Sequence, residues 1–308
     1  MSSEHPTAVQ GGPNVVLPRA IHLVPLDRIA GFDVRPGLYE TNGATAIPGG
    51  VNFTVHSHGA TAIELLLFHR GESEPFAVLP FPQHYRIGNV YSMIVFKLSI
   101  EEFEYAYQVH GPYEPDKGLI FDPSRYLLDP YAKAVTGQSR WGETPPHGQH
   151  YRARVVKDDF DWGNIGQPLI PMEDLVIYEL HVRGFTKDPS SGVEHPGTFA
   201  GLMEKLPYLE KLGVNAIELM PIFEFDEMLD YREVNGEKLY NYWGYSTVSF
   251  FAPNTSYTAS TEYNREGNEL KKLIQACKHR GIEVYLDVVF NHTAEGNEMG
   301  PFFSFKGY

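Results

Sequence analysis

Three apolar runs in the second half of the chain decide the fold: Leu175-Val-Ile-Tyr-Glu-Leu-His-Val182, Ala216-Ile-Glu-Leu-Met220 and Ile282-Glu-Val-Tyr-Leu-Asp-Val-Val289. Such short, nearly continuous apolar runs are typical of strands buried on both faces of a parallel sheet. Helical sequence separates them, so we predict the order strand, helix, strand, loop, helix, strand with right-handed crossovers. Function in such sheets lies at the carboxyl ends of the strands, in this chain after Pro221 and after Val289.

Two segments between these runs carry helical spacing. Thr198 opens the first, which ends at Gly213 and contains Pro207, where we predict a local kink. Its apolar positions are Phe199, Leu202, Met203, Leu206, Leu209 and Leu212. In the second helix one face carries Leu270, Leu273, Ile274 and Cys277, and Gly281 is the stop signal.

The first half of the chain has a different rhythm. Short runs with β-branched or aromatic residues at alternate positions cover residues 51–55, 62–68, 90–98 and 103–109, with glycine-containing turns between them. This spacing favours an antiparallel β-sandwich of about 100 residues. The fold class we predict is therefore multidomain, a β-sandwich followed by an α/β unit.

Changes in this rhythm set the expected domain boundaries. We assign residues 1–30 to an N-terminal arm and 31–137 to the β-sandwich. Residues 138–171 hold many turn formers and no sustained period, so we assign them to a linker, and 172–308 to the α/β unit.

Composition narrows the class of partner. The 25 Lys and Arg against 39 Asp and Glu give a net charge of −14, which argues against binding to nucleic acid or to an acidic membrane. The 19 Tyr, 19 Phe and 3 Trp offer flat faces on which sugar rings stack. A single cysteine, no apolar leader and no run long enough to span a membrane predict a cytoplasmic protein.

The segment Asp287-Val-Val-Phe-Asn-His-Thr293 holds the first candidate site residues. Asp287 has the same strand parity as Asn291, and an acidic residue among Val and Leu needs a partner when it is buried. His292 follows the strand and is free to point into a cleft. The alternative, in which Asp287 caps the next turn and His292 is merely exposed, is equally well supported by periodicity.

The run Tyr240-Asn-Tyr-Trp-Gly-Tyr245 is the second candidate. Its four aromatic residues, Trp243 and Tyr245 among them, offer stacking faces for a sugar. Long ordered loops also pack on their own aromatic side chains, and this alternative stays open. We favour a binding role because the loop ends beside the strand of Asp287.

Other polar clusters carry weaker signals. The loop carboxylates Glu224, Asp226, Glu227 and Asp230 are able to act as acid and base or to ligate calcium, but we expect a solvated acidic surface. Glu179, His181 and Arg183 share one face at the end of the first strand, where we expect a structural network.

At these residues the chain resembles the bacterial glycogen-debranching and isoamylase branch of the α-amylase superfamily, glycoside hydrolase family 13. Val176 to Thr186 resembles the first barrel strand of that family, and Gly213 to Pro221 resembles the second. Asp287 to His292 matches the first conserved region of the family. His110-Gly-Pro-Tyr-Glu-Pro115 and Leu128-Asp-Pro-Tyr-Ala-Lys133 are typical of its starch-binding-like β-sandwich. The resemblance implies an incomplete (β/α)8 TIM barrel, with about three of its eight strands, behind a carbohydrate-binding-like module.

The resemblance also implies roles for single residues. Tyr245 stacks on the sugar in subsite −1, His292 hydrogen-bonds its hydroxyl groups and Asp287 orders the site, while Trp243 and Asn291 complete the substrate-binding set. Asn291 matches a calcium ligand of many amylases that isoamylase-type members generally do not use. A calcium ion near the second strand would need Glu224, and Phe225 stands where a second oxygen ligand is expected. We therefore predict no metal and no cofactor.

The same resemblance implies hydrolysis of α-1,6 branch linkages in glycogen, amylopectin or limit dextrin. A retaining glycosidase needs two carboxyl groups about 5–5.5 Å apart. In this family they follow the fourth and fifth strands, beyond Tyr308, so we expect no catalytic residue in this chain and no activity of the chain alone. The alternatives are a non-catalytic α-glucan-binding protein, a branching enzyme and a maltooligosyl-trehalose hydrolase.

Overall fold

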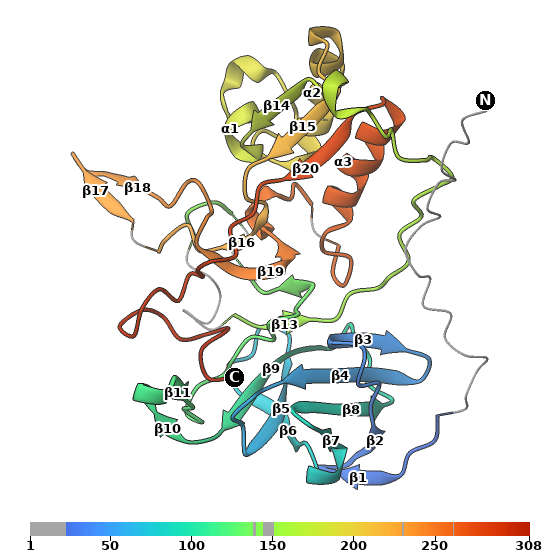
Figure 1. Ribbon diagram of the computed structural model, residues 1–308, viewed down its shortest axis with the longest axis vertical. Coiled ribbons are helices and arrows are strands. Elements are labelled where there is room, and N and C mark those ends of the chain that lie inside the picture. Colours follow the sequence, from blue (N-terminus) through green and yellow to red (C-terminus); the bar gives the residue numbers. More distant parts are fainter. Residues whose placement is uncertain (1–22, 138–139, 144–150, 230, 261) are drawn as a thin grey trace, which may run out of the picture.

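The structure is a computed structural model that describes residues 23–137, 140–143, 151–229, 231–260 and 262–308. Two units follow each other along the chain, an antiparallel sandwich and a parallel sheet covered by helices (Figure 1). This is the multidomain β plus α/β class predicted from the sequence. Within the described residues no helix has the length and apolar character needed to cross a membrane.

Two antiparallel sheets form the sandwich. One has the order β1-β2-β8-β4-β3, with β7 beside β8, and the other has the order β12-β13-β9-β5-β6. The strands of the first sheet are β1 (Asp27–Ile29), β2 (Phe32–Pro36), β3 (Gly43–Ile47), β4 (Gly50–His56), β7 (Arg86–Ile87) and β8 (Val90–Phe96). Those of the second are β5 (Ala62–His69), β6 (Pro75–Pro80), β9 (Phe103–His110), β12 (Ala134–Val135) and β13 (Ala153–Arg154).

The sandwich core confirms the period-2 pattern. Phe53, Leu65 and Tyr105 are fully or almost fully buried between the sheets, and Phe53 meets Tyr105 edge to face at 5.3 Å between ring centroids. A short hairpin, β10 (Tyr113–Glu114) with β11 (Leu119–Ile120), projects from this unit. Two short 3-10 helices, η1 (Gln83–Tyr85) and η2 (Pro115–Lys117), accompany the sandwich strands, and η3 (Met172–Asp174) and η4 (Pro189–Ser191) lie further along the chain.

Two strands lie outside the range expected for the sandwich. β1 falls within residues 1–30, which we assigned to an arm, and pairs with β2. β13 falls within residues 138–171, which we assigned to a linker, and pairs with both β12 and β9. Much of the remainder of these two segments lies outside the described residues. Short strands of two or three residues are too brief to show a period, which explains why the sequence pattern missed them.

The second unit is a parallel sheet of order β14-β15-β20. β14 (Ile177–Leu180), β15 (Ala216–Leu219) and β20 (Glu283–Leu286) are in register, so that Leu180, Leu219 and Leu286 lie in one row. α2 (Phe199–Leu212) follows β14, and α3 (Asn268–His279) precedes β20. This confirms the predicted order and the parallel sheet of a partial barrel.

The helix boundaries confirm the predicted caps. The Thr198 side chain accepts a hydrogen bond from the Gly201 N–H at the start of α2, and Gly213 ends the helix in the left-handed conformation with φ +87°. Pro207 lies inside α2, which continues to Leu212, and the kink stays a prediction. The buried face of α3 carries Leu273 and Cys277.

Two strand ends differ from the prediction. The first strand ends at Leu180, because His181 caps a short helix, α1 (Val182–Lys187), that the apolar run concealed. The third ends at Leu286, not at Val289, so Asp287 lies just past the strand. At both positions the pairing of the strand stops: the chain continues as a helix after His181 and as a loop after Leu286.

The long connection after Pro221 has its own structure. β16 (Phe223–Phe225) pairs with β19 (Thr247–Pro253), and between them a hairpin of β17 (Arg232–Val234) and β18 (Glu237–Leu239) projects away from the molecule (Figure 1). A 3-10 turn, η5 (Thr255–Tyr257), follows. Val248 and Ala252 of β19 belong to the same apolar cluster as the sandwich core, so this connection joins the two units.

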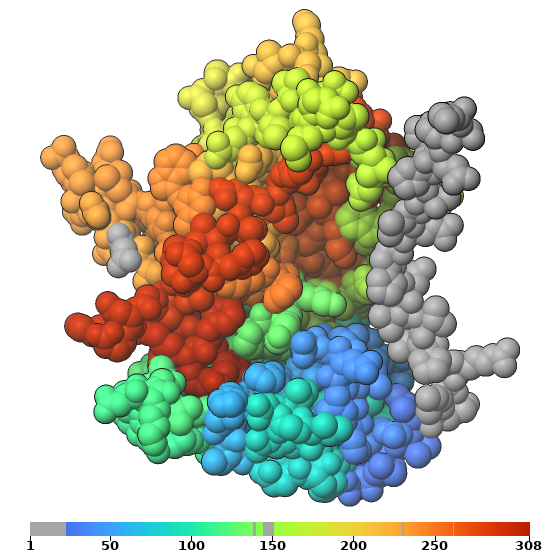
Figure 2. All heavy atoms as spheres, in the orientation of Figure 1, coloured from blue at the N-terminus to red at the C-terminus, as the bar shows by residue number. Residues whose placement is uncertain are grey.

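Polar contacts strengthen the same junction. Arg154 of β13 forms ion pairs with Glu104 at 3.0 Å and with Glu266 at 2.9 Å. The C-terminal segment, red in Figure 2, lies between the sandwich and the parallel sheet, and the Tyr308 hydroxyl donates to the Leu128 carbonyl at 2.9 Å. The sandwich is therefore attached to the second unit by polar contacts as well as by the shared apolar cluster.

Candidate functional site

Tyr245 and Asp287 meet at the carboxyl end of the parallel sheet. The Tyr245 hydroxyl donates a hydrogen bond of 2.5 Å to Oδ2 of Asp287. The Asp287 N–H donates to the Leu219 carbonyl at 2.9 Å, which fixes this residue beside the end of β15. The structure thus joins one residue from each of the two sequence candidates, the aromatic loop and the third strand.

The hydrogen bond changes the acidity of the phenol. It is the main cause that raises the pKa of Tyr245 to about 12, followed by burial and by the negative charge of Asp287. Glu179 and Glu218 raise this pKa further. Tyr245 therefore acts at neutral pH as a hydrogen-bond donor with a flat ring face, and not as an acid or a base.

Glu218 is a site residue that the sequence analysis missed. Glu179 and Glu218 are paired in the β14–β15 register, and both have the strand parity of Asp287. The negative charges of these two strand residues act on the Tyr245 phenol together with that of Asp287. The signal was present in the sequence, since a glutamate precedes leucine at the same position of the first two apolar runs.

A glycine allows the aromatic loop to approach the sheet. Gly244 has φ +80°, and a Cβ atom placed on it would lie 2.7 Å from Cε1 of Phe225, well inside van der Waals contact. An L side chain at position 244 would be both strained and sterically blocked. Gly244 therefore determines how Trp243 and Tyr245, on either side of it, are presented.

The other predicted site residues are exposed. Trp243 is 55 % exposed and meets the edge of Tyr242 at 5.6 Å between ring centroids. Asn291 and His292 are exposed beyond β20 and make no hydrogen bond within the described part of the chain. The structure brings Tyr245 and Asp287 together and leaves these three side chains free for a ligand.

His181 supports the aromatic loop from the end of β14. Its ring stacks on Tyr242 at 4.1 Å with an interplanar angle of 10°. Its Nδ1 accepts a hydrogen bond from the Gly184 N–H at 3.1 Å, and burial lowers its pKa. The neutral ring therefore carries its proton on Nε2, which donates to the Tyr242 carbonyl at 2.7 Å and lies 3.1 Å from the Tyr257 hydroxyl. These contacts agree with the structural network expected at His181.

Trp141 extends the support. Its ring stacks on Tyr257 at 6.1 Å and 9°, and meets the edge of Tyr242 at 6.0 Å. The Arg183 guanidinium lies over the Trp141 ring, 4.4 Å from its centroid. The loop with the exposed Trp243 thus rests on an aromatic base in which Tyr257 is buried and Trp141 is half-buried.

The loop carboxylates do not form the solvated acidic surface expected from the sequence. Glu224, Asp226 and Glu227 are buried, not a solvated surface, while Asp230 lies outside the described residues. The Glu224 carboxylate accepts from the Thr255 N–H at 3.0 Å, and Glu227 accepts from the Ser256 hydroxyl at 2.6 Å. The hydrogen-bond partners of these carboxylates lie about thirty residues downstream, so the local sequence does not show that the carboxylates are buried.

Burial also changes the acidity of this pair. It raises the pKa of Glu227 to about 7, against the hydrogen bonds from Ser256 and Asn254. It raises the pKa of Glu224 well above its usual range, with a further contribution from the charge of Glu227. In the described part of the chain no three His, Cys, Asp or Glu side chains are grouped to hold a metal ion.

Comparison with known proteins agrees with this architecture. Residues 41–132 match carbohydrate-binding module 48, the isoamylase N-terminal domain, and residues 162–302 match the alpha-amylase catalytic domain. The first match covers most of the sandwich, and the second covers the parallel sheet, its helices and the aromatic loop. A protein with this order of domains is a carbohydrate-active protein with a binding module in front of a catalytic domain.

Curated relatives narrow the class. Isoamylase 1, chloroplastic, of Oryza sativa subsp. japonica is 44% identical over 286 residues, which cover 89% of this chain and 35% of the relative. The glycogen operon protein GlgX homolog of Mycobacterium tuberculosis is 36% identical over 298 residues, with 89% and 40% covered. The glycogen debranching enzyme of Serratia proteamaculans is 32% identical over 296 residues, with 89% and 42% covered.

Solved structures show the same fold. The GBS pullulanase SAP in complex with maltotetraose is 28% identical, with a TM-score of 0.63 over 84% of this chain and 35% of the pullulanase. A pullulanase mutant from Paenibacillus barengoltzii, complexed with maltotriose, is 25% identical, with a TM-score of 0.64 over 83% and 39%. The chain belongs to the isoamylase and GlgX-type debranching branch of the α-amylase family. It spans between 35% and 42% of the length of the curated relatives named above.

Proposed function

We propose that the protein of which this chain is a part hydrolyses α-1,6 branch linkages of glycogen or a related α-glucan by a retaining mechanism. The observation that carries the proposal is the Tyr245–Asp287 hydrogen bond at the carboxyl end of the parallel sheet. An aromatic ring and a carboxylate at this end of the sheet support the proposal, because barrel enzymes bind their substrates at the carboxyl ends of their strands. The matched carbohydrate-binding module and the debranching relatives favour an α-glucan as the substrate.

Each site residue has a role in this proposal. Tyr245 stacks on the glucosyl ring next to the scissile bond and is oriented through its hydroxyl by Asp287. His292 and Asn291, both exposed beyond β20, hydrogen-bond sugar hydroxyl groups, and Trp243 offers a further stacking face. The partners are glycogen, amylopectin and limit dextrin, and we place the protein in the cytoplasm, where its one cysteine, Cys277, stays reduced.

We further propose that the 308-residue chain does not hydrolyse glucan by itself. A retaining mechanism needs a carboxylate nucleophile and a carboxylic acid on opposite sides of the scissile bond. Asp287 is engaged by Tyr245, and the raised pKa values of Glu224 and Glu227 arise mainly from burial of their side chains. None of these three carboxyl groups is offered to a substrate as such a pair.

The activity is tested on amylopectin with two proteins. The chain joined to the remaining barrel of a debranching relative should release linear chains and raise the iodine colour, and the chain alone should release no reducing ends. Absence of new reducing ends with the joined protein would refute the debranching proposal. Hydrolysis by the chain alone, purified free of amylase, would refute its inactivity.

A second candidate function is α-glucan binding without catalysis. It is favoured by the exposure of Trp243 and Tyr242 on a loop that rests on a rigid base. Migration in a glycogen-containing native gel should be retarded, and Tyr245→Ala should restore free migration if the barrel part binds the sugar. Unretarded migration of the unmodified chain would exclude this function.

A further inference from the structure

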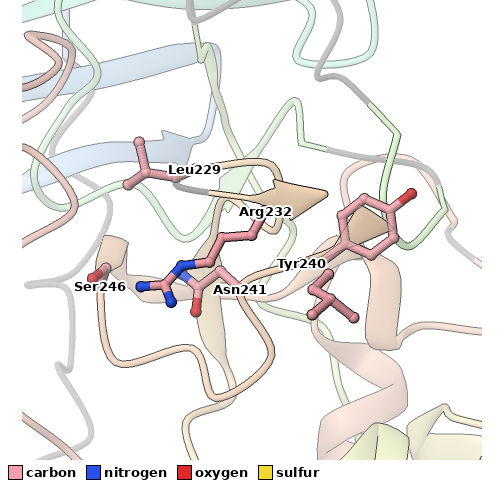
Figure 3. A pocket seen from close by; sticks show the side chains of 6 residues that line it. Leu229, Arg232, Tyr240, Asn241 and Ser246 are labelled. Carbon is pink, nitrogen blue, oxygen red and sulfur yellow. The ribbon is translucent and has the colours of Figure 1, made fainter. Parts of the chain in front are cut away.

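A polar pocket lies beside the aromatic loop. It has a volume of about 260 Å³ and opens at the base of the β17–β18 hairpin (Figure 3). Its lining residues are Leu229, Arg232, Leu239, Tyr240, Asn241 and Ser246. Asn241 and Ser246 flank the run of residues 242–245, so the pocket is built on the two ends of the loop that carries Trp243 and Tyr245.

The walls of this pocket are held in place. Arg232 pairs with Leu239 across the hairpin, and the turn residues Asn235 and Gly236 have φ +55° and +82°, the combination of a type I′ turn that fixes the register. The Asn241 N–H donates to the Glu227 carbonyl at 2.9 Å, which ties the floor to the buried part of the connection. The pocket is thus a formed feature of the loop.

The chemistry of the pocket is that of a sugar site. The polar ends of Arg232, Asn241 and Ser246 face the same concavity, and none of them has a hydrogen-bond or ion-pair partner among the residues that the structure describes. A guanidinium, an amide and a hydroxyl offer both donors and acceptors, while Leu229 and Leu239 add apolar surface. A hydroxyl-rich ring with apolar C–H faces fits this set, and the net charge of −14 disfavours a polyanion.

We propose that this pocket is a second glucosyl subsite, in which Arg232, Asn241 and Ser246 bind the hydroxyl groups of an α-glucan whose neighbouring part stacks on Tyr245. Ser246 follows Tyr245 directly, and consecutive Cα atoms are about 3.8 Å apart, so one oligosaccharide reaches both places. The subsite rests on the proposed function, because it assigns a further contact to the same ligand.

The test measures binding of maltoheptaose to the full 308-residue chain by isothermal titration calorimetry. Arg232→Gln should raise the dissociation constant about tenfold, the effect of losing one charge-assisted hydrogen bond. Ser246→Ala should raise it by a smaller factor. Lys238→Gln is the matched control: it removes a positive charge from the same hairpin but outside the pocket, and should leave binding unchanged.

The outcomes separate this inference from the proposed function. If the unmodified chain binds, Tyr245→Ala weakens binding and Arg232→Gln does not, the subsite is refuted and the proposed function stands. If the unmodified chain binds neither maltoheptaose nor glycogen, the subsite and α-glucan binding by this chain are both refuted, while debranching by the joined protein is decided by its own assay. Displacement of maltoheptaose by inorganic phosphate, lost in Arg232→Gln, would show an anion site and would also overturn the sugar assignment.

Discussion

The imidazole of His181 lies parallel to the ring of Tyr242, 4.1 Å away, and its Nε2 lies 2.7 Å from the Tyr242 carbonyl oxygen. One side chain at the end of β14 thus contacts both the ring and the backbone of the aromatic loop. Its second nitrogen caps α1. The first strand of the sheet therefore determines the position of a loop that lies sixty residues downstream.

His181→Ala should loosen the aromatic loop. It removes a helix cap, worth about 0.5–2 kcal/mol, together with a buried hydrogen bond and a stacking contact, so we expect unfolding in urea to require about 2–4 kcal/mol less. The emission of the exposed Trp243 should change as its neighbours move. His195→Ala, at an exposed position before α2, is the control, and equal stability of the two variants would contradict the role of His181.

Stability should fall as the pH rises through the range in which Glu227 titrates. Burial raises the pKa of Glu227 from its ordinary 4.5 to about 7, so the folded chain holds this proton more tightly than the unfolded chain. The contribution of Glu227 to the free energy of unfolding is therefore largest below pH 4.5, declines between pH 4.5 and 7, and stays constant above pH 7. The difference across this range is up to about 3 kcal/mol.

Glu227→Gln tests this dependence with an isosteric side chain. The variant should be more stable than the parent at pH 8 and close to it at pH 4.5, as measured by urea unfolding at each pH. Glu237→Gln on the exposed strand β18 provides the same charge change at the surface and should leave the pH profile unchanged. Identical profiles for the parent and Glu227→Gln would show that the pKa of Glu227 is not raised.

Elements determined by one periodic pattern could be predicted from the sequence, whereas contacts between residues far apart in the chain could not. The strands and α2 follow from apolar spacing and from the caps Thr198 and Gly213. The burial of Glu224 does not, since it depends on Thr255 and on Gly137, where an added Cβ would lie 2.6 Å from Oε2 of the carboxylate. A charged residue is ordinarily exposed, and only the tertiary fold overrules that expectation.

The candidate site shows the same division. Tyr245 and Asp287 could each be singled out from their local sequence, but their hydrogen bond joins residues 42 positions apart and needed the structure. His181 was correctly expected in a network, although its partner Tyr242 was not foreseen. His292 is exposed beyond β20, and its role in binding stays a prediction.

Asp287→Asn should lower the pKa of Tyr245. The hydrogen bond to the Asp287 carboxylate is the largest cause of the rise to about 12, and the amide removes the negative charge that favours the protonated phenol. Carbon-13 NMR of labelled tyrosine, with Tyr245→Phe to assign the resonance, should show its titration moving toward pH 10. Asp188→Asn, an exposed substitution that changes the net charge equally, should leave it unmoved. An unchanged titration in Asp287→Asn would mean that the hydrogen bond does not persist in solution.

Gly244→Ala should disturb the loop through a clash that a second glycine does not share. Gly244 and Gly236 have nearly the same φ, +80° and +82°, but an added Cβ meets the Phe225 ring at 2.7 Å only at position 244, and nothing within 4 Å at position 236. Gly236→Ala therefore measures the backbone strain alone, about 1 kcal/mol, while Gly244→Ala adds overpacking for a total of about 2–4 kcal/mol. Because Tyr245 follows directly, Gly244→Ala should also weaken glycogen retardation in a native gel. Equal losses of stability in the two variants would mean that the loop moves away from Phe225 without resistance, and that Gly244 does not determine how Tyr245 is presented.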